Sequence, residues 1–216
     1  MSIRERLDIS AYLVIGQENT SRPVEEVVTA AVAEGFTCIQ IRSKVATARE
    51  LIATLDKSAR AIRELGKCDS VALLVDDRLD VVLAAREAGI KVDGVHVGQS
   101  DIPVAVCRKY LGNDSIVGLS ARNSFGINPA LVDYIGAGVL HPTGTKSDAD
   151  AVITLEEIAE LVKVSPIPVV IGGGVKVEDL PALAATGVGG FFVVSAVAGA
   201  DNPRLAASKI VRAWRN

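Results

Sequence analysis

Residues 134–146 read YIGAGVLHPTGTK. The first six residues are apolar and mostly small, as expected of a buried strand in a parallel sheet. Pro142 ends this run and opens a polar loop that carries Thr143, Thr145 and Lys146. Because ligands of α/β folds bind where parallel strands end, these hydroxyl and ammonium groups are candidates to bind a phosphate. Taken alone, the run Thr-Gly-Thr-Lys fits an ordinary surface turn better, so the phosphate site depends on the rest of the chain.

Apolar and amphipathic segments alternate along the whole chain. Strands are predicted at 8–15, 36–42, 71–76, 94–98, 115–119, 134–139, 168–171 and 191–195. Helices are predicted at 23–35, 47–65, 79–88, 103–111, 129–132, 154–164, 177–185 and 203–214. Eight such units in 216 residues predict an α/β fold, a single (β/α)8 TIM barrel spanning residues 1–216. An open doubly wound sheet shows the same alternation, but no Gly-x-Gly-x-x-Gly follows the first strand, which favours the barrel.

The composition excludes several classes of protein. A hydrophobic content of 49% with only 4% aromatic residues fits helices packed closely on a parallel sheet. A net charge of −3 provides no basic surface for nucleic acid. No apolar run approaches the ~18 residues that a membrane span needs, and the charged start MSIRERLDIS does not resemble a signal peptide. We therefore expect a cytoplasmic protein with neither nucleic-acid nor membrane partners.

Few residues of the chain suit a soft metal ion or a disulfide framework. The three cysteines, Cys38, Cys68 and Cys107, are far apart and form no CxxC pair. Only two histidines, His96 and His141, are present. A zinc site or a histidine-rich metal centre is therefore not expected, and a metal bound here would have oxygen ligands.

Three polar residues follow one another at every second position of the second predicted strand. Gln40, Arg42 and Lys44 share a face because alternate residues of a strand point the same way. Gathering two cations in a barrel mouth is costly unless an anion compensates them, which favours a bound phosphate. The alternative is that Arg42 and Lys44 lie in the outer loop and contact water.

Carboxylates end the next two predicted strands. The third strand ends in Asp76-Asp77-Arg78, and Asp101 follows the fourth in the run GVHVGQSD. Asp77 and Asp101 are candidate ligands for Mg²⁺, which takes one or two protein carboxylates and completes its shell with water and substrate phosphate. Alternatively, each could cap the helix that follows it, and both roles can coexist.

A second phosphate position is predicted at the last two strands. Gly172, Gly173 and Gly174 let backbone amides approach a ligand, and Ser195 ends the eighth strand. The alternative is a tight turn. No Ser-His-Asp set or activated cysteine is evident, so a reaction that needs a strong enzymic base or nucleophile is poorly supported.

The order of QIRSK, DDRLDVVLA, GVHVGQSD, GLSAR, YIGAGVLHPTGTK, VVIGGG and VVSAV resembles the thiamine phosphate synthase family over nearly the whole chain. The resemblance implies a Mg²⁺-dependent barrel enzyme of thiamine biosynthesis. It would transfer the pyrimidinylmethyl group of 4-amino-5-hydroxymethyl-2-methylpyrimidine pyrophosphate to thiazole phosphate, releasing pyrophosphate. These small-molecule substrates would be its partners, together with a possible second copy of the chain in a homodimer.

The resemblance also implies roles for individual residues. The substrate-binding residues it implies are Gln40 and Asp76 towards the pyrimidine pyrophosphate, and Thr143, Gly173, Val194 and Ser195 around the thiazole phosphate. The residues implied to hold the leaving pyrophosphate are Arg42, Lys44, Ser120, Thr145 and Lys146. Asp77 and Asp101 would bind Mg²⁺. The pyrimidine supports a carbocation-like methylene as pyrophosphate leaves, and the thiazole nitrogen attacks without deprotonation, so the protein mainly positions and neutralises.

Several positions depart from the family's usual pattern, and they cluster around the pyrimidine and pyrophosphate. Asp76 and Arg122 stand where the family usually has Asn and His. Two other functions are retained as alternatives. One is a thiazole tautomerase, although Arg122 weighs against it because that reaction relies on a histidine at this position. The other is a catalytically weak paralogue that binds thiamine phosphates, which the departures at Asp76 and Arg122 keep open.

Overall fold

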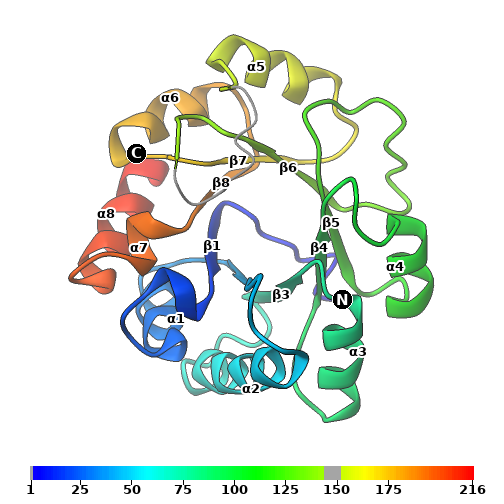
Figure 1. Cartoon of the computed structure of the whole chain (residues 1–216). Helices are drawn as coiled ribbons and strands as arrows, with labels where there is room; N and C mark the ends of the chain where they lie inside the picture. Colours follow the sequence, from blue (N-terminus) through cyan, green and yellow to red (C-terminus); the bar gives the residue numbers. More distant parts are fainter. Residues whose placement is uncertain (1, 144–151) are drawn as a thin grey trace.

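Eight parallel strands form a closed barrel in the computed structural model, which describes residues 2–143 and 152–216 (Figure 1). Each strand pairs with the next, and the last pairs with the first. The strands are β1 (Ala11–Ile15), β2 (Cys38–Ile41), β3 (Ala72–Asp76), β4 (Gly94–Val97), β5 (Ile116–Ser120), β6 (Tyr134–Gly138), β7 (Val169–Gly172) and β8 (Gly190–Val193). The predicted (β/α)8 fold is confirmed.

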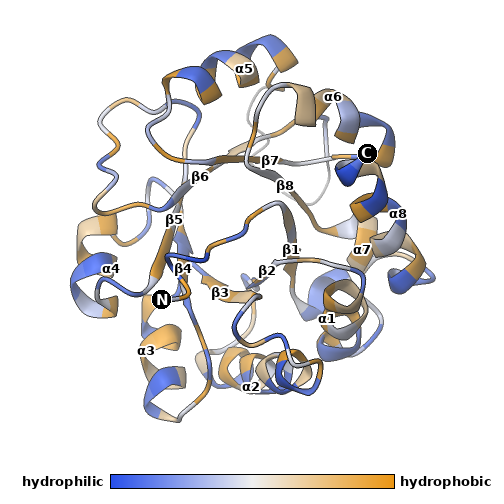
Figure 2. Ribbon diagram, turned by 180° about the vertical axis from the view of Figure 1, so that it is seen from behind, coloured by the Kyte–Doolittle hydropathy of each residue, from blue (hydrophilic) through white to orange (hydrophobic). Residues whose placement is uncertain are grey.

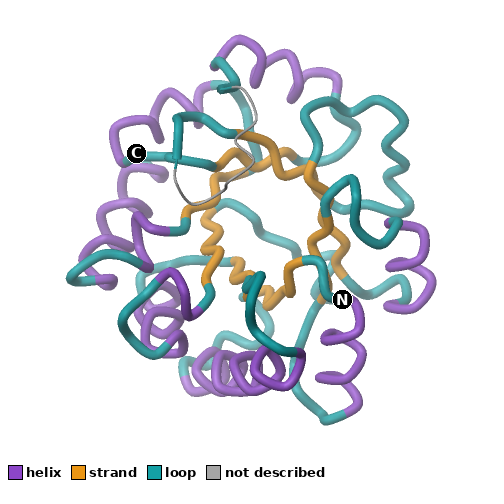
Figure 3. Tube along the Cα trace, in the orientation of Figure 1, coloured by secondary structure: helices purple, strands orange, loops and turns teal. Residues whose placement is uncertain are grey.

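Helices surround the barrel on the outside (Figure 3). They are α1 (Val24–Ala33), α2 (Ala48–Glu64), α3 (Leu79–Glu87), α4 (Val104–Leu111), α5 (Leu155–Val164), α6 (Leu180–Ala185), α7 (Ser195–Ala198) and α8 (Pro203–Arg215). Two short 3₁₀ helices, η1 (Gln17–Asn19) and η2 (Val177–Asp179), follow β1 and precede α6. No helix of the described ranges is long and apolar enough to span a membrane.

The helix predicted at 129–132 is wrong. This stretch forms a single turn, in which the amides of Leu131 and Val132 both donate to the carbonyl of Asn128. The turn does not propagate, because the next amide, that of Asp133, donates to Val117 of β5 and so belongs to the sheet. One turn alone cannot offset the cost of helix nucleation. The connection 121–133 therefore consists of turns and loops.

Alternation along each strand creates two separate cores. Leu13, Ile39 and Leu73 point outwards and pack against the helices in the larger cluster. Tyr12 and Tyr134 point inwards and belong to a smaller cluster that fills the barrel. Figure 2 shows apolar residues concentrated on the strands, while the helices carry both kinds on different sides. The barrel interior is therefore packed with side chains, as in other barrels of this class.

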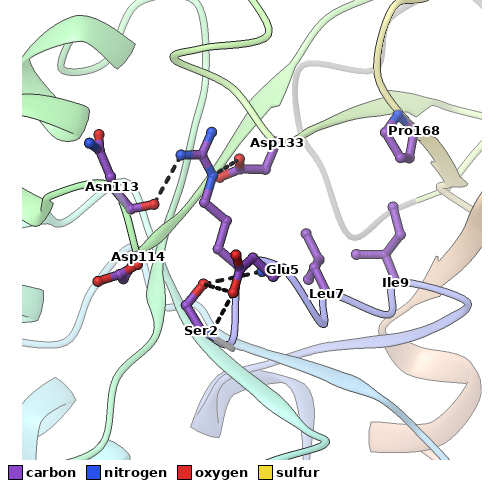
Figure 4. Close-up of a pocket in the computed structure, with 9 residues that line it drawn as sticks. Ser2, Glu5, Leu7, Ile9, Asn113, Asp114, Asp133 and Pro168 are labelled. Atoms are coloured by element: carbon purple, nitrogen blue, oxygen red, sulfur yellow. Dashed lines mark hydrogen bonds and ion pairs between the residues drawn. The ribbon is translucent and has the colours of Figure 1, made fainter.

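The N-terminal segment is bound to the amino end of the barrel by a buried aspartate. Asp133, just before β6, accepts from Arg4 at 2.6 Å, from Arg108 at 2.7 Å and from the amide of Val117 at 2.7 Å. Figure 4 shows Asp133 and Asn113 at a hollow lined by residues that precede the strands. The volume of this hollow is about 490 Å³. This hollow is thus at the opposite end of the barrel from the predicted site.

Candidate active site

The polar residues predicted on β2 converge on one carboxylate at the carboxyl end of β3. Asp76 Oδ1 accepts from Gln40 Nε2 at 2.5 Å, and Oδ2 lies 3.1 Å from Arg42 Nε. Lys44 Nζ lies 3.5 Å from the same Oδ2 and also bonds to Asp77. The register that pairs Gln40 with Leu74 brings Arg42 level with Asp76. The Arg42 side chain is 23% exposed and faces the barrel mouth, so the outer-loop alternative is wrong for Arg42. Lys44 also contacts Asp76, but it lies in the loop beyond β2 with its side chain 56% exposed, so the alternative holds in part for Lys44.

Burial and charge act in opposite directions on this cluster. The Asp76 side chain is only 10% exposed. Burial raises the pKa of its carboxyl group, while the charges of Arg42 and Lys44 act to lower it, and the net effect is a raised pKa. For Lys44, burial lowers the pKa, but the hydrogen bond to Asp77 and the charge of Asp76 outweigh it, so the pKa is raised. Lys44 thus stays charged.

The two predicted metal ligands follow adjacent strands. Asp77 has left-handed backbone (φ 59°), a conformation that is rare for residues other than glycine and is often found at functional sites. Its amide donates to the carbonyl of His96 at 2.8 Å. Asp101 Oδ2 accepts from the amide of Gly98 at 2.8 Å, which closes the loop after β4.

Neither aspartate caps a helix. The N-cap positions of α3 and α4 are Arg78 and Pro103, and neither helix has a side-chain cap. The capping alternatives are therefore wrong for both residues. Asp77 instead bonds to Lys44, and Asp101 to its own loop.

The donor chemistry of this edge fits Mg²⁺. In the described part of the chain, no group of three His, Cys, Asp or Glu side chains is arranged around a common point. Mg²⁺ does not require one, because one or two carboxylates and the substrate's phosphate oxygens with water complete its octahedron. One carboxylate beside a cation that attracts phosphate, with a second in the loop after the adjacent strand, therefore suits this ion.

Beneath this edge, His96 of β4 joins Ser120, the last residue of β5, to Tyr134, the first residue of β6. Its side chain is buried, with Nδ1 2.9 Å from the hydroxyl of Tyr134 and Nε2 2.9 Å from Oγ of Ser120. His96 is therefore a buried residue with hydrogen-bond partners at both ring nitrogens. Tyr134 was not predicted to contribute a polar group here. The signal was available, because a tyrosine buried by strand alternation needs a partner for its hydroxyl.

The glycine turn after β7 lies next to β6 and β8. Gly173 and Gly174 have φ of +82° and +75°, and a Cβ atom on Gly173 would lie 2.5 Å from Cγ1 of Val139. The backbone at Gly173 therefore lies so close to the β6 loop that a residue with a Cβ atom would not fit there. The carbonyl of Gly173 accepts from the amide of His141 at 3.0 Å.

On the neighbouring strand, β8 is followed directly by α7, which begins at the exposed residue Ser195. Val194 immediately precedes this helix. Thr143, at the end of the described part of the β6 loop, is half-buried. Loops after β7 and β8 with a short additional helix are a common phosphate-binding arrangement in such barrels.

The remaining three residues named from the sequence are Thr145, Lys146 and Arg122. Thr145 and Lys146 lie outside the described residues. Arg122 is exposed just after β5.

A closed (β/α)8 barrel whose strand ends gather cations, carboxylates and a glycine turn defines a class of barrel enzymes. The family model for thiamine monophosphate synthase matches residues 11–197. The chain therefore belongs to the thiamine monophosphate synthase family, a family of transferases, as the sequence resemblance predicted.

Individual relatives agree with the family model over nearly full length. The chain is 38% identical to the thiamine-phosphate synthase of Corynebacterium efficiens, with 97% of this chain and 96% of that protein covered. It is 36% identical to the thiamine-phosphate synthase of Ruminiclostridium cellulolyticum, with 99% of each covered. Among solved structures, thiamine phosphate pyrophosphorylase from Pyrococcus furiosus matches with a TM-score of 0.82, 30% identity and 98% of each chain covered.

Proposed function

We propose that this chain is a thiamine phosphate synthase that couples 4-amino-5-hydroxymethyl-2-methylpyrimidine pyrophosphate to thiazole phosphate in a Mg²⁺-assisted, dissociative substitution. The observation that carries the proposal is the cluster at the ends of β2 and β3. There Arg42 and Lys44 both form ion pairs with Asp76, and Lys44 also pairs with Asp77. A pyrophosphate leaving group needs such compensation of negative charge.

The cations would bind and neutralise the pyrophosphate. Arg42 and Lys44 are paired with Asp76, so an incoming anion would compete with a carboxylate that burial already disfavours in its charged form. Lys146 and Thr145 from the loop after β6 would complete this side, as the family resemblance implies. Mg²⁺, held by Asp77 and Asp101, would supply the additional positive charge for the leaving group.

The remaining groups would position the two substrates. Gln40, with its amide fixed by Asp76, would face the pyrimidine. Thr143, Gly173, Val194 and Ser195 would hold the thiazole phosphate at the ends of β6, β7 and β8. Holding the thiazole nitrogen close to the developing methylene cation accelerates the reaction without a protein base.

The thiazole tautomerase alternative is weakened by residue 122. That reaction would rely on a histidine at this position, and the chain has an exposed arginine there. The weak paralogue differs from the synthase only in turnover, so a direct assay separates the two.

Steady-state formation of thiamine phosphate from the two substrates, with and without Mg²⁺, tests the proposal. We expect metal-dependent product, and Arg42→Ala and Asp101→Ala should each lower kcat by at least ~10²-fold, the loss typical of a leaving-group stabiliser. Arg60→Ala is the matched control, because Arg60 pairs with Asp56 on the exposed surface of α2. Near-normal turnover in Arg42→Ala, or no product from folded protein, would contradict the assignment.

A further inference from the structure

A continuous chain of hydrogen bonds crosses the barrel interior beneath the site. Its bonds join Asp76 to Gln40 (2.5 Å), Gln40 to Tyr12, Tyr12 to Tyr134 (2.8 Å), Tyr134 to His96 (2.9 Å) and His96 to Ser120 (2.9 Å). We call these six residues the interior chain. The interior chain connects Gln40, which is implied to face the pyrimidine, with Ser120, which is implied to lie at the pyrophosphate. The direction of its hydrogen bonds therefore affects which groups each residue can bind.

The carboxylate at one end fixes the orientation of Gln40. A carboxylate held by Arg42 and Lys44 accepts hydrogen bonds and does not donate them. Gln40 must therefore turn Nε2 to Asp76 and Oε1 to Tyr12. Because that oxygen can only accept, the hydroxyl of Tyr12 donates to it.

The direction of hydrogen-bond donation at Gln40 fixes the direction of every following bond in the interior chain. Each tyrosine hydroxyl has one proton, and burial raises the pKa values of Tyr12 and Tyr134 well above their ordinary value, so both keep it. Since Tyr12 donates to Gln40, Tyr134 donates to Tyr12, and Nδ1–H of His96 donates to Tyr134. In the neutral imidazole, Nε2 then accepts, and the hydroxyl of Ser120 donates to it.

Two glycines make room for this arrangement. A Cβ atom on Gly118 would lie 2.3 Å from Cζ of Tyr134 and 2.5 Å from Nδ1 of His96. A Cβ atom on Gly136 would lie 2.9 Å from Cε1 of His96. In the sheet register, Gly118 lies between His96 and Tyr134. Its missing side chain lets the two rings contact each other across β5.

We propose that Tyr134 is a positioning residue that holds His96 as the Nδ1–H tautomer and thereby turns the hydroxyl proton of Ser120 inward, so that the Ser120 oxygen accepts a hydrogen bond from bound substrate. The inferred partner is a donor such as the amino group of the pyrimidine. This differs from the pyrophosphate contact that the resemblance implies for Ser120, because pyrophosphate oxygens only accept hydrogen bonds. The identity of that substrate rests on the proposed function, whereas the tautomer and its dependence on Tyr134 do not.

Nitrogen NMR of the ¹⁵N-labelled full chain tests the inference. The sequence has two histidines, so a His141→Gln variant assigns the imidazole signals of His96. We expect wild-type His96 to be protonated at Nδ1 and not at Nε2 at neutral pH. Tyr134→Phe removes only the hydroxyl group that Nδ1–H bonds to, and should move the proton to Nε2, where it can donate to Ser120.

Kinetics and a packing control complete the test. Tyr134→Phe should lower kcat/KM for thiamine phosphate formation by about 10-fold to 100-fold, the scale of a small misplacement at a reacting site. Val170→Ala is the control, because Val170 is fully buried in the same interior cluster but contributes no polar group. It should leave the His96 tautomer unchanged.

The wild-type spectrum alone can overturn the inference, whether or not the variant folds or the chain proves to be a synthase. His96 protonated at Nε2 in the wild type would reverse the polarity and refute it. A folded Tyr134→Phe variant that keeps the Nδ1–H tautomer would refute the role of Tyr134.

Discussion

Asp76 places a negative charge where the expected pyrophosphate would bind. The family's usual asparagine has the same shape without the charge. In this chain the carboxylate holds Arg42, Lys44 and the amide of Gln40 in one arrangement before substrate arrives. Asp76 therefore orders the side chains of the free site, but its negative charge also repels the incoming pyrophosphate.

The raised pKa of Asp76 leads to a pH-dependent prediction. Because the folded-state pKa lies above the unfolded value of about 3.9, the favourable contribution of this carboxyl group is fully present below that value. It is lost as the pH rises through the folded-state pKa. Asp76→Asn keeps the shape without the charge, so it should raise the free energy of unfolding at pH 7.

Urea unfolding at a series of pH values, without added divalent metal, measures this effect. The difference between Asp76→Asn and wild type should shrink as the pH falls below about 3.9, where the carboxyl group becomes protonated in both the folded and the unfolded state. Asp56→Asn, on the exposed surface of α2, is the control and should change stability little. A variant less stable than wild type at pH 7 would contradict the prediction.

At the scale of elements, the strands set the site by alternating large and small residues. β5 carries Gly118 at the position level with His96 of β4 and Tyr134 of β6, and β6 carries Gly136 level with Val170 of β7. Similarly, a Cβ atom on Gly172 of β7 would lie 2.1 Å from Cε2 of Phe192. Side chains from one strand thus fill space that the next leaves open, which ties the geometry of the site to the packing of the barrel.

Gly118→Ala tests this coupling. The added methyl group would overlap Tyr134 and His96, so we expect a loss of about 1–3 kcal/mol in the free energy of unfolding, typical of overpacking. Chemical denaturation followed by circular dichroism measures it. Gly89→Ala is the matched control, because nothing lies within 4 Å of that position. Its cost should be limited to its left-handed backbone (φ +74°), about 1 kcal/mol. A smaller loss at Gly118 than at Gly89 would refute the packing argument.

The strands and their inward faces were predictable from sequence, whereas the partners of the side chains were not. Strand periodicity predicted that Gln40, Arg42 and Lys44 share one side of the chain. All three do contact Asp76, although β2 itself ends at Ile41 and Lys44 lies in the following loop. That all three converge on Asp76 depends on the register between β2 and β3, which the sequence of neither strand specifies. The same reason explains why the interior chain was missed, since its bonds cross from strand to strand.

At the scale of the whole molecule, buried charges hold the amino end together while the carboxyl end is left for chemistry. Asp133 and Arg108 are 8% and 6% exposed, and the pair joins α4 to the start of β6. Asp133 also binds Arg4 from the other end of the sequence. Closing the barrel with long-range contacts at the end away from the site leaves the opposite loops free to vary, as is usual in this fold.

Removing this anchor should destabilise the whole barrel. Asp133→Ala leaves Arg108 buried without its counterion and the amide of Val117 without its acceptor, so a loss of about 3–5 kcal/mol is expected. Asp69→Ala is the matched control, because its pair with Arg6 is long, at 3.7 Å, and exposed. Thermal melting compares the two. Equal melting temperatures for the two variants would rule out the anchoring role.

The connection between β5 and β6 has a practical consequence for re-engineering the barrel. Residues 121–133 cross the outer wall without a helix, and Phe125 at the tip is 95% exposed. Exposed loop tips of this kind accept inserted sequence and new chain termini more readily than helical crossovers, whose apolar faces are committed to the core. A reporter domain spliced in here would be carried on the outside of the barrel, with the strand register on either side intact.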